Sequence, residues 1–406
     1  MKQGEQLMTK KGLSGTFLPN RVEPIHRWYS YIEGYSSELV EKELSKLDLD
    51  SISSIYDPFG GTGTTLLAAS CKNIKPYYSE TNPFMRGVVE TKINDVRSLT
   101  NYDDLVMQID LFKEKLFKSN LREETIDVAW DGFEKYFTEE ALKDVLLIKN
   151  VIQEEQHKHL KRILMLALSS VLVKSSKMIR RGDLRFAKER EKKDVCPVRE
   201  AFLMKLDEII DDIIQHGASV KKNVELLAPD VRDIDAENLI DCIITSPPYL
   251  NGTNYIRNTK LELKLNDYIV GENDLKQYHS EGIVAGINNV SKRKGPGKRL
   301  KCIEGYLEQL TPVAYDKRIP IMVERYFYDM NEVLIKLSQV LKNDGVFIMD
   351  IGDSQFAGVH IPTHDILSEL CENNGFRKYD EEILRDRYSK NGMKLSQKVL
   401  RFILEK

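Results

Sequence analysis

A glycine-rich turn early in the chain most constrains how it can fold. Residues 57–65 read Asp-Pro-Phe-Gly-Gly-Thr-Gly-Thr-Thr. They follow a β-prone run, Ser51 to Tyr56, and precede the helix-like run LLAASCK. Strand, glycine turn and helix in this order open a doubly wound α/β unit, and glycines let the backbone approach a ligand closely. We therefore predict an α/β fold with a ligand bound at this turn.

The class of ligand follows from what the turn lacks. A nucleoside-triphosphate loop needs a lysine after its second glycine, and none follows here. A dinucleotide fingerprint needs a third glycine at position 66, which is Leu66. S-adenosylmethionine remains, because its carboxylate can sit at the N-terminus of the following helix. Glu80 ends a predicted second strand, 17 residues beyond Gly63, where an acid can bind a ribose diol.

A rigid polar turn, Ser246-Pro247-Pro248-Tyr249, follows the apolar run 239–245, which suits a strand buried on both faces. Two prolines fix φ and remove two N–H donors, so the neighbouring carbonyls can accept hydrogen bonds. The Ser246 oxygen and a proline carbonyl could then hold an exocyclic amine. A base must leave the duplex stack to reach such a turn, and Tyr249 offers an aromatic face for stacking. We predict that these four residues are catalytic.

These two motifs together resemble the amino-group DNA methyltransferases, which modify cytosine N4 or adenine N6. DPFGGTGTT matches the family's cofactor motif, and TSPPY matches its catalytic motif in the serine form usual for N4-cytosine enzymes. The cofactor motif precedes the catalytic motif here, whereas many serine-type members have the reverse order. The resemblance implies a Rossmann-like class I fold with a mostly parallel seven-stranded sheet, and it implies that Ser246 to Tyr249 hold a flipped cytosine.

Weaker matches extend the resemblance. Residues 79–84 look like the family's acidic motif, residues 228–233 place Asp230 near the adenine, and residues 26–38 resemble a segment that caps the cofactor. The predicted residues for binding S-adenosylmethionine are Tyr29, Asp57, Pro58, Phe59, Gly60, Gly61, Gly63, Thr64, Thr65, Glu80, Thr81, Asn82, Asp230 and Val231.

The distribution of apolar, charged and polar residues along the chain predicts its organisation. Residues 1–20 are predicted to be a flexible tail, and residues 21–98 with 223–406 to form the catalytic domain. Between them, residues 99–222 carry periodic apolar residues among many charges, which predicts a helical insertion with a role in DNA binding. Residues 270–318 are polar and are predicted to form a loop or subdomain that recognises the target.

Two basic stretches are candidates for DNA contact, although the net charge is −3. Residues 174–199 contain ten Lys or Arg against four acids, and residues 292–301 contain six and no acid. A nucleic-acid enzyme needs only a local basic surface. The predicted DNA-binding residues are Lys177, Arg180, Arg181, Arg185, Arg257, Lys292, Arg293, Lys294, Lys298 and Arg299.

The remaining features exclude several classes of protein. The five cysteines are scattered singly, which argues against a disulfide framework or a zinc ribbon, and we predict no metal site. No run approaches 18 uncharged apolar residues and no signal peptide is visible, so we expect a cytoplasmic protein without a membrane span. The expected partners are double-stranded DNA and a cognate restriction endonuclease, and the oligomeric state stays open.

Three alternatives to an N4-cytosine enzyme remain at this point. The target base could be adenine, modified at N6. The substrate could be RNA, as for guanine-N2 enzymes, although those favour Asp or Asn in the catalytic turn. The chain could also be a binding module on a decayed methyltransferase fold, but intact glycines and an intact Ser-Pro-Pro-Tyr turn argue against this.

Overall fold

A seven-stranded sheet organises the computed structural model, which describes residues 15–31, 34–119, 130, 132–181, 183–191, 195–250, 254–290, 297–389 and 391–406. The order of strands is β10-β11-β7-β6-β1-β2-β5. Every pairing is parallel except those of β11, which is antiparallel to both neighbours. The predicted α/β fold with a mostly parallel sheet is thereby confirmed. The strands are β1 (Ser54–Asp57), β2 (Lys75–Ser79), β5 (Glu225–Ala228), β6 (Ile240–Thr245), β7 (Leu341–Gly352), β10 (Phe376–Tyr388) and β11 (Lys394–Leu404).

The order in which strands are added to the sheet reverses between β1 and β6. From β1 the chain adds β2 and β5 on one side, then returns to add β6 and β7 on the other. In open parallel sheets, ligands bind at the carboxyl ends of the strands where the order reverses. The glycine turn follows β1 and the Ser-Pro-Pro-Tyr turn follows β6, so both motifs emerge at this point.

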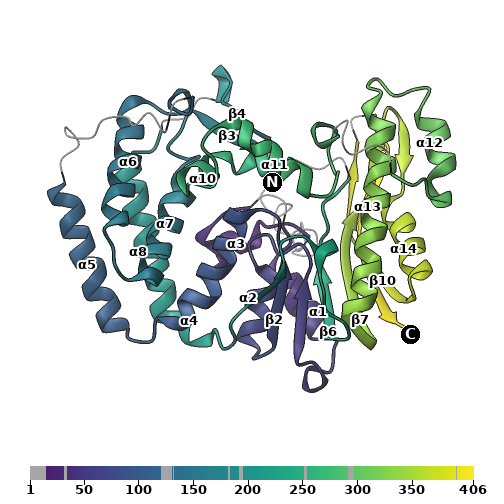
Figure 1. The fold of residues 1–406 in the computed structure, drawn as a ribbon, viewed down its shortest axis with the longest axis horizontal. Coiled ribbons are helices and arrows are strands. Elements are labelled where there is room, and N and C mark those ends of the chain that lie inside the picture. Colours follow the sequence, from purple (N-terminus) through teal and green to yellow (C-terminus); the bar gives the residue numbers. More distant parts are fainter. Residues whose placement is uncertain are drawn as a thin grey trace, which may run out of the picture.

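Helices cover both faces of the sheet (Figure 1). On one face, α1 (Ser37–Leu44) and α2 (Thr64–Cys71) pack against Ile55 of β1 and Ile244 of β6. On the other, α13 (Arg318–Val340) and α14 (Thr363–Asn373) pack against Tyr56 and Ile243, the neighbouring positions of the same strands. Successive strand residues point to opposite faces, so a continuous apolar run is what a strand between two helical layers requires.

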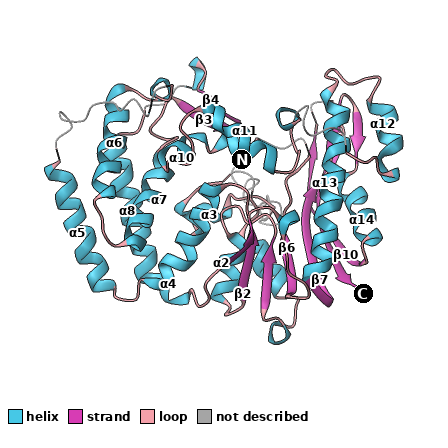
Figure 2. Cartoon of the chain, viewed as in Figure 1, coloured by secondary structure: helices cyan, strands magenta, loops and turns pink. Residues whose placement is uncertain are grey.

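The described part of residues 99–222 is mostly helical and lies beside the sheet (Figures 1 and 2). One core cluster joins this region to Leu66 of α2 and Val88 of α3, so its helices pack onto the sheet domain rather than forming a separate core. The predicted domain boundaries stay predictions. The helices of this region include α5 (Tyr102–Lys118), α6 (Glu139–Gln153), α7 (Lys158–Val171) and α8 (Val198–His216), whereas α3 (Pro83–Glu90) precedes it in the chain.

Two segments differ from the sequence-based expectation, and a third, β10, was not predicted as a strand. The hairpin β3 (Met178–Arg181) and β4 (Asp183–Phe186) lies within the region predicted to be helical. The charged run FRKYDEEILRDRY forms β10, an edge strand in which only Phe376 and Leu384 are buried. Residues 1–14 of the predicted tail lie outside the described residues. Residues 15–20 are not a loose tail, because Phe17 and Asn20 are buried and the Asn20 amide donates to the Tyr35 carbonyl at 3.1 Å.

Across the described ranges, no helix combines the length and the apolar character needed to span a membrane.

Candidate active site

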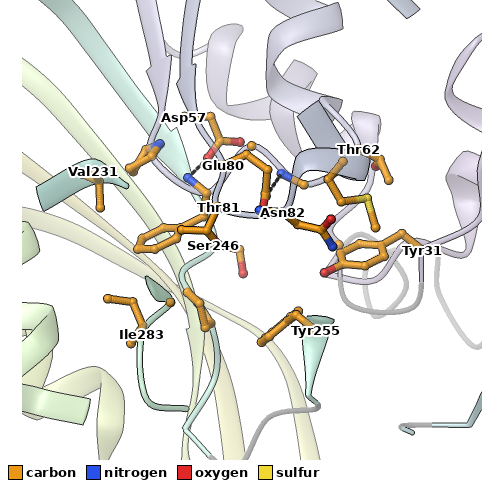
Figure 3. A pocket seen from close by; sticks show the side chains of 18 of the residues that line it. Tyr31, Asp57, Thr62, Glu80, Thr81, Asn82, Val231, Ser246, Tyr255 and Ile283 are labelled. Carbon is orange, nitrogen blue, oxygen red and sulfur yellow. Dashed lines mark hydrogen bonds between the residues drawn. The ribbon is translucent and has the colours of Figure 1, made fainter. Parts of the chain in front are cut away.

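A cavity opens at the carboxyl ends of β1, β2, β5 and β6, and both sequence motifs contribute to its wall. In Figure 3, Glu80 and Thr81 lie along one side of the cavity, Ile283 and Tyr255 lie on the opposite side, and Ser246 lies between them. The wall consists of Tyr31, Gly34, Tyr35, Asp57, Pro58, Phe59, Gly60, Gly61, Thr62, Thr64, Glu80, Thr81, Asn82, Met85, Pro229, Asp230, Val231, Ser246, Pro248, Tyr255, Ile256, Tyr278, Gly282, Ile283 and Asn289.

The glycine turn has a shape that side chains would block. A Cβ on Gly60 would lie 3.0 Å from the Tyr78 ring, and Gly61 and Gly63 have φ angles of 50° and 80°. Gly63 N donates to Gly60 O at 2.7 Å, which closes the turn directly before α2 begins at Thr64. The turn therefore exposes backbone to the cavity, as a loop that cradles a ligand must.

Asp57 joins three parts of the site beneath this turn. Its carboxylate accepts hydrogen bonds from Thr245 Oγ1 at 2.7 Å, from Tyr35 OH at 3.0 Å and from Phe59 N at 3.0 Å. Burial raises the pKa of this carboxyl to about 6, and the three hydrogen bonds oppose that shift. Asp57 thus fastens the end of β1 to the end of β6 and to the segment around Tyr35.

Glu80 presents a buried carboxylate to the cavity. One oxygen accepts from Gly61 N at 2.9 Å and the other from Asn82 N at 2.8 Å. Burial raises the pKa of Glu80 to about 7. A carboxylate oxygen has two lone-pair sites, so each oxygen keeps one for a further donor. Two vicinal hydroxyls of a ribose fit such a pair of acceptors, and the exposed backbone of the glycine turn fits the amino-acid end of S-adenosylmethionine.

The Ser-Pro-Pro-Tyr turn is held from several directions. Tyr326 OH donates to the Pro248 carbonyl at 3.0 Å, and Tyr249 N donates to Tyr255 OH at 3.3 Å. The Tyr249 hydroxyl donates to Asp350 at 3.2 Å. The Pro248 carbonyl, one of the two candidate proline acceptors, therefore already has one protein donor, which leaves its second lone pair for another.

Most of the predicted cofactor residues lie in the cavity wall, but several predicted residues do not. Tyr29 is 2% exposed and its hydroxyl donates to Glu262 at 3.0 Å, whereas Tyr31, two residues on, lines the cavity. Gly63 and Thr65 support the turn from behind, and Thr65 Oγ1 lies 2.5 Å from Tyr35 OH. Pro247 and Tyr249 of the catalytic turn are also outside the wall, while Ser246 and Pro248 are within it.

Asp230 lines the cavity as predicted, but its carboxylate is engaged by Arg232. Asp230 Oδ1 accepts from the backbone N and the Nε of Arg232, both at 2.9 Å, and Oδ2 accepts from a terminal guanidinium nitrogen at 2.5 Å. Arg232 also lies 3.3 Å from Asp329 of α13.

Several wall residues were missed by sequence reasoning. Tyr31 and Tyr35 lie within the segment that resembles the capping motif, and Tyr255 and Ile256 follow the catalytic turn at once, so both pairs had a positional signal. Nothing in the sequence marked Tyr278, Ile283 or Asn289 as cavity residues. They belong to the region predicted to recognise the target.

Arg180 departs from its predicted role in DNA contact. Its side chain is 13% exposed, and its terminal nitrogen lies 2.6 Å from Glu262 Oε1 and 2.9 Å from the Asn258 carbonyl. Its guanidinium also lies 5.7 Å from the centre of the Tyr29 ring. A buried arginine with these partners ties the hairpin β3–β4 to α9 (Tyr255–Asn258) and α10 (Lys260–Leu265), and it does not offer its charge to a phosphate.

The other predicted DNA contacts fall into three groups. Arg185 pairs with Glu191 at 2.8 Å, and Arg299 pairs with Glu324 at 2.9 Å. Lys177, Arg257 and Lys298 are exposed. Lys292, Arg293 and Lys294 lie outside the described residues, and the Arg181 side chain is not described.

Comparison with known proteins finds relatives among type II methyltransferases. No family model matches it. The type II methyltransferase M.AvaI of Nostoc sp. is 26% identical over 399 residues, covering 89% of this chain and 81% of the relative. M.BsoBI of Geobacillus stearothermophilus is 24% identical, covering 94% and 84%. M.MvaI of Kocuria varians is 22% identical, covering 91% and 85%.

A solved rRNA methyltransferase of Streptomyces viridochromogenes is similar over 94% of this chain and 85% of its own, at 11% identity and a TM-score of 0.31, a likeness too weak to support an argument. The similarity to the type II enzymes covers about nine-tenths of this chain and more than four-fifths of each relative. The chain is a homologue, at modest identity, of type II methyltransferases.

Proposed function

We propose that this chain is an S-adenosylmethionine-dependent methyltransferase that modifies the exocyclic N4 of a flipped cytosine in double-stranded DNA. The observation that carries the proposal is that Ser246 lines the same cavity as the glycine turn and Glu80. A methyl donor and an amine acceptor have to meet in one enclosure, and these residues supply the binding groups for each. The proposal includes a restriction-modification role, with a cognate endonuclease as partner, by analogy with the type II relatives.

One half of the cavity would bind the cofactor. Glu80 would accept hydrogen bonds from the ribose hydroxyls, Gly60 and Gly61 would border the amino-acid end, and Asp230 and Val231 would border the adenine. When bound, the cofactor supplies a methyl group on a sulfonium, which is an electrophile that needs no activation by the protein. The protein's task is then to orient the acceptor amine and exclude water.

The acceptor half consists of the Ser-Pro-Pro-Tyr turn. Ser246 Oγ and the free lone pair of the Pro248 carbonyl would each accept one proton of the exocyclic amine. Two such acceptors draw the nitrogen lone pair out of conjugation with the ring, so the nitrogen can form its bond to the methyl carbon as the carbon–sulfur bond breaks. The amine then carries one proton too many, and that proton leaves to solvent. Catalysis of this kind depends on positioning and polarisation.

The choice of cytosine rests on the serine that begins the turn, which is the form usual for N4-cytosine enzymes in the family that the motifs resemble. The exposed residues Lys177, Arg257 and Lys298 are the proposed phosphate contacts. Phosphate contacts would set the register of the enzyme on DNA without reading its sequence.

Product analysis tests the proposal. The protein is incubated with mixed-sequence duplex DNA and S-adenosylmethionine, the DNA is digested to nucleosides, and the methylated nucleoside is identified by mass spectrometry. We expect N4-methylcytosine, and we expect none from the Ser246→Ala variant. N6-methyladenine would keep the chemistry and overturn the base. Methylation of RNA alone would overturn the DNA substrate, and no product on either nucleic acid would leave a non-catalytic binding module.

A further inference from the structure

A lysine lies buried behind the glycine turn. Lys92 is 1% exposed and belongs to the π-helical turn Thr91–Asp95 that continues α3. Its ammonium Nζ donates to the Thr62 carbonyl at 3.3 Å and to the His26 carbonyl at 3.1 Å. Single π-helical turns are rare and occur frequently at functional sites.

The two carbonyls belong to two segments that each contribute a residue to the cavity wall. Thr62 is part of the glycine turn, and His26 begins the segment that carries Tyr31. In Figure 3, Thr62 and Tyr31 lie at the same end of the cavity. Lys92 therefore joins the two walls from outside the cavity, through the backbone of each.

The Lys92 ammonium has no carboxylate partner among the described residues. Asp95, on the same turn, is engaged by Arg162 and His159, and Asp212 of α8 is engaged by Arg27 and by Trp28 Nε1 at 2.9 Å. The other titratable groups nearby do not compensate the charge of the Lys92 ammonium: Lys205 of α8 carries the same charge, and the imidazole of His26 is buried. Burial lowers the pKa of Lys92 to about 7.

A buried ammonium without a counter-ion is costly, so the group either loses its proton, which the lowered pKa of Lys92 favours, or keeps its charge when a ligand supplies the counter-charge. The cofactor proposed above carries one carboxylate, at the end of the molecule that meets the glycine turn. We propose that Lys92 is a positioning residue for this amino-acid end: it sets the distance between the glycine turn and the Tyr31 segment, and its positive charge attracts the ligand's carboxylate through the turn. The inference rests on the proposed function.

The proposal separates two ligands that differ at one end only. S-adenosylhomocysteine has the carboxylate, and 5′-methylthioadenosine keeps the adenosine and the sulfur but lacks the amino-acid part. Binding of each is measured by isothermal titration calorimetry to wild type, to Lys92→Met and to a control, Lys264→Met. Lys264 is also a buried lysine that donates to a carbonyl, Val270 O at 2.6 Å, but that carbonyl belongs neither to the glycine turn nor to the Tyr31 segment.

We expect Lys92→Met to raise the Kd of S-adenosylhomocysteine about tenfold, which is the effect of one unit charge about 12 Å away at an effective dielectric constant of about 20. The Kd of 5′-methylthioadenosine should change less than about twofold, and Lys264→Met should leave both ligands unaffected. The melting temperature of ligand-free Lys92→Met should equal or exceed that of wild type, since the variant no longer buries a charge.

Other outcomes overturn the inference. Equal weakening of both ligands would mean that Lys92 only supports the fold of the turn, and no weakening would mean that it has no role in binding. If Lys92→Met does not fold, Lys92→Gln keeps a donor without the charge and should show the same loss, confined to the ligand with the carboxylate. Failure of the wild type to bind either ligand would instead overturn the proposed function.

Discussion

The hydroxyl of Tyr249 donates a hydrogen bond to Asp350 Oδ2 at 3.2 Å. Asp350 lies on β7, and Gln397 of β11 donates to the same hydroxyl at 2.8 Å. The aromatic end of the Ser-Pro-Pro-Tyr turn is thus fastened to two strands of the sheet. The turn is positioned by distant parts of the chain as well as by its own prolines.

This anchoring separates the role of the ring from that of the hydroxyl. Tyr249→Phe removes the two hydrogen bonds of the hydroxyl, each worth about 1 kcal/mol, and keeps the ring. Tyr249→Ala also removes the surface on which a base would stack, worth about 1–3 kcal/mol. We expect kcat/KM for DNA methylation to fall less than about tenfold in Tyr249→Phe and by about tenfold to a hundredfold more in Tyr249→Ala. Equal losses in the two variants would show that the ring does not stack on the target.

Asp350 also predicts a pH dependence of stability. Burial raises its pKa to about 7, so in the folded state it holds a proton that the unfolded chain releases near pH 4. The unfolded state then binds fewer protons between these values, and stability falls as pH rises from about 4 to about 7. Asp350→Asn cannot ionise, so its stability relative to wild type should rise by at least about 1 kcal/mol between pH 5 and pH 8. Urea unfolding at both pH values measures this, and parallel changes in the two proteins would contradict it.

The sequence predicted the centre of the fold well because its signals there are local. The glycine turn and the run before Ser246 carry their structure in a few consecutive residues, whose apolar and glycine positions are set by the two-sided sheet. β10 could not be predicted in this way. It is an edge strand with one exposed side, so its charged residues carry no apolar alternation, and only pairing with β11 makes it a strand.

The side chains that were misassigned depend on partners far away in the sequence. Arg180 is buried by Glu262, which lies 82 residues further along the chain, so its basic stretch resembled an exposed one. Tyr29 and Tyr31 both fit the loose capping motif, and only the packing of Tyr29 against Phe84 decides which of them reaches the cavity. Lys92 looks like an ordinary solvated lysine of a helix until the glycine turn is folded over it.

Ser246 should affect the chemical step and leave cofactor binding intact. Removing one acceptor aimed at the reacting group typically costs about a hundredfold to a thousandfold in kcat. We therefore expect Ser246→Ala to lower kcat by that order, while the Kd of S-adenosylhomocysteine stays within about twofold of wild type. Ser246→Thr keeps the hydroxyl and should retain more activity than Ser246→Ala. A parallel rise in the cofactor Kd would show that Ser246 supports the cavity rather than the amine.

The exposed basic residues should contribute to the salt dependence of DNA binding. Each lysine that neutralises a phosphate contributes about 0.9 to the slope of log affinity against log salt. Lys177 and Lys298 are exposed, so the double variant Lys177→Ala/Lys298→Ala should reduce that slope by about 2, measured by fluorescence anisotropy with duplex DNA. Lys118→Ala, an exposed lysine on α5 at the outer side of the helical region, is the control and should leave the slope unchanged (Figure 1).

Arg180→Met should differ from the lysine double variant and from Lys118→Ala, because it should lower the stability of the protein. It leaves Glu262 buried without its cation, which typically costs about 3–5 kcal/mol, so the variant should unfold at lower urea concentration. At a temperature where it remains folded, its salt slope should equal that of wild type, because Arg180 faces the protein interior. An unchanged slope in the lysine double variant would remove Lys177 and Lys298 from the DNA surface. A reduced slope in a stable Arg180→Met would mean that this arginine leaves Glu262 to contact DNA.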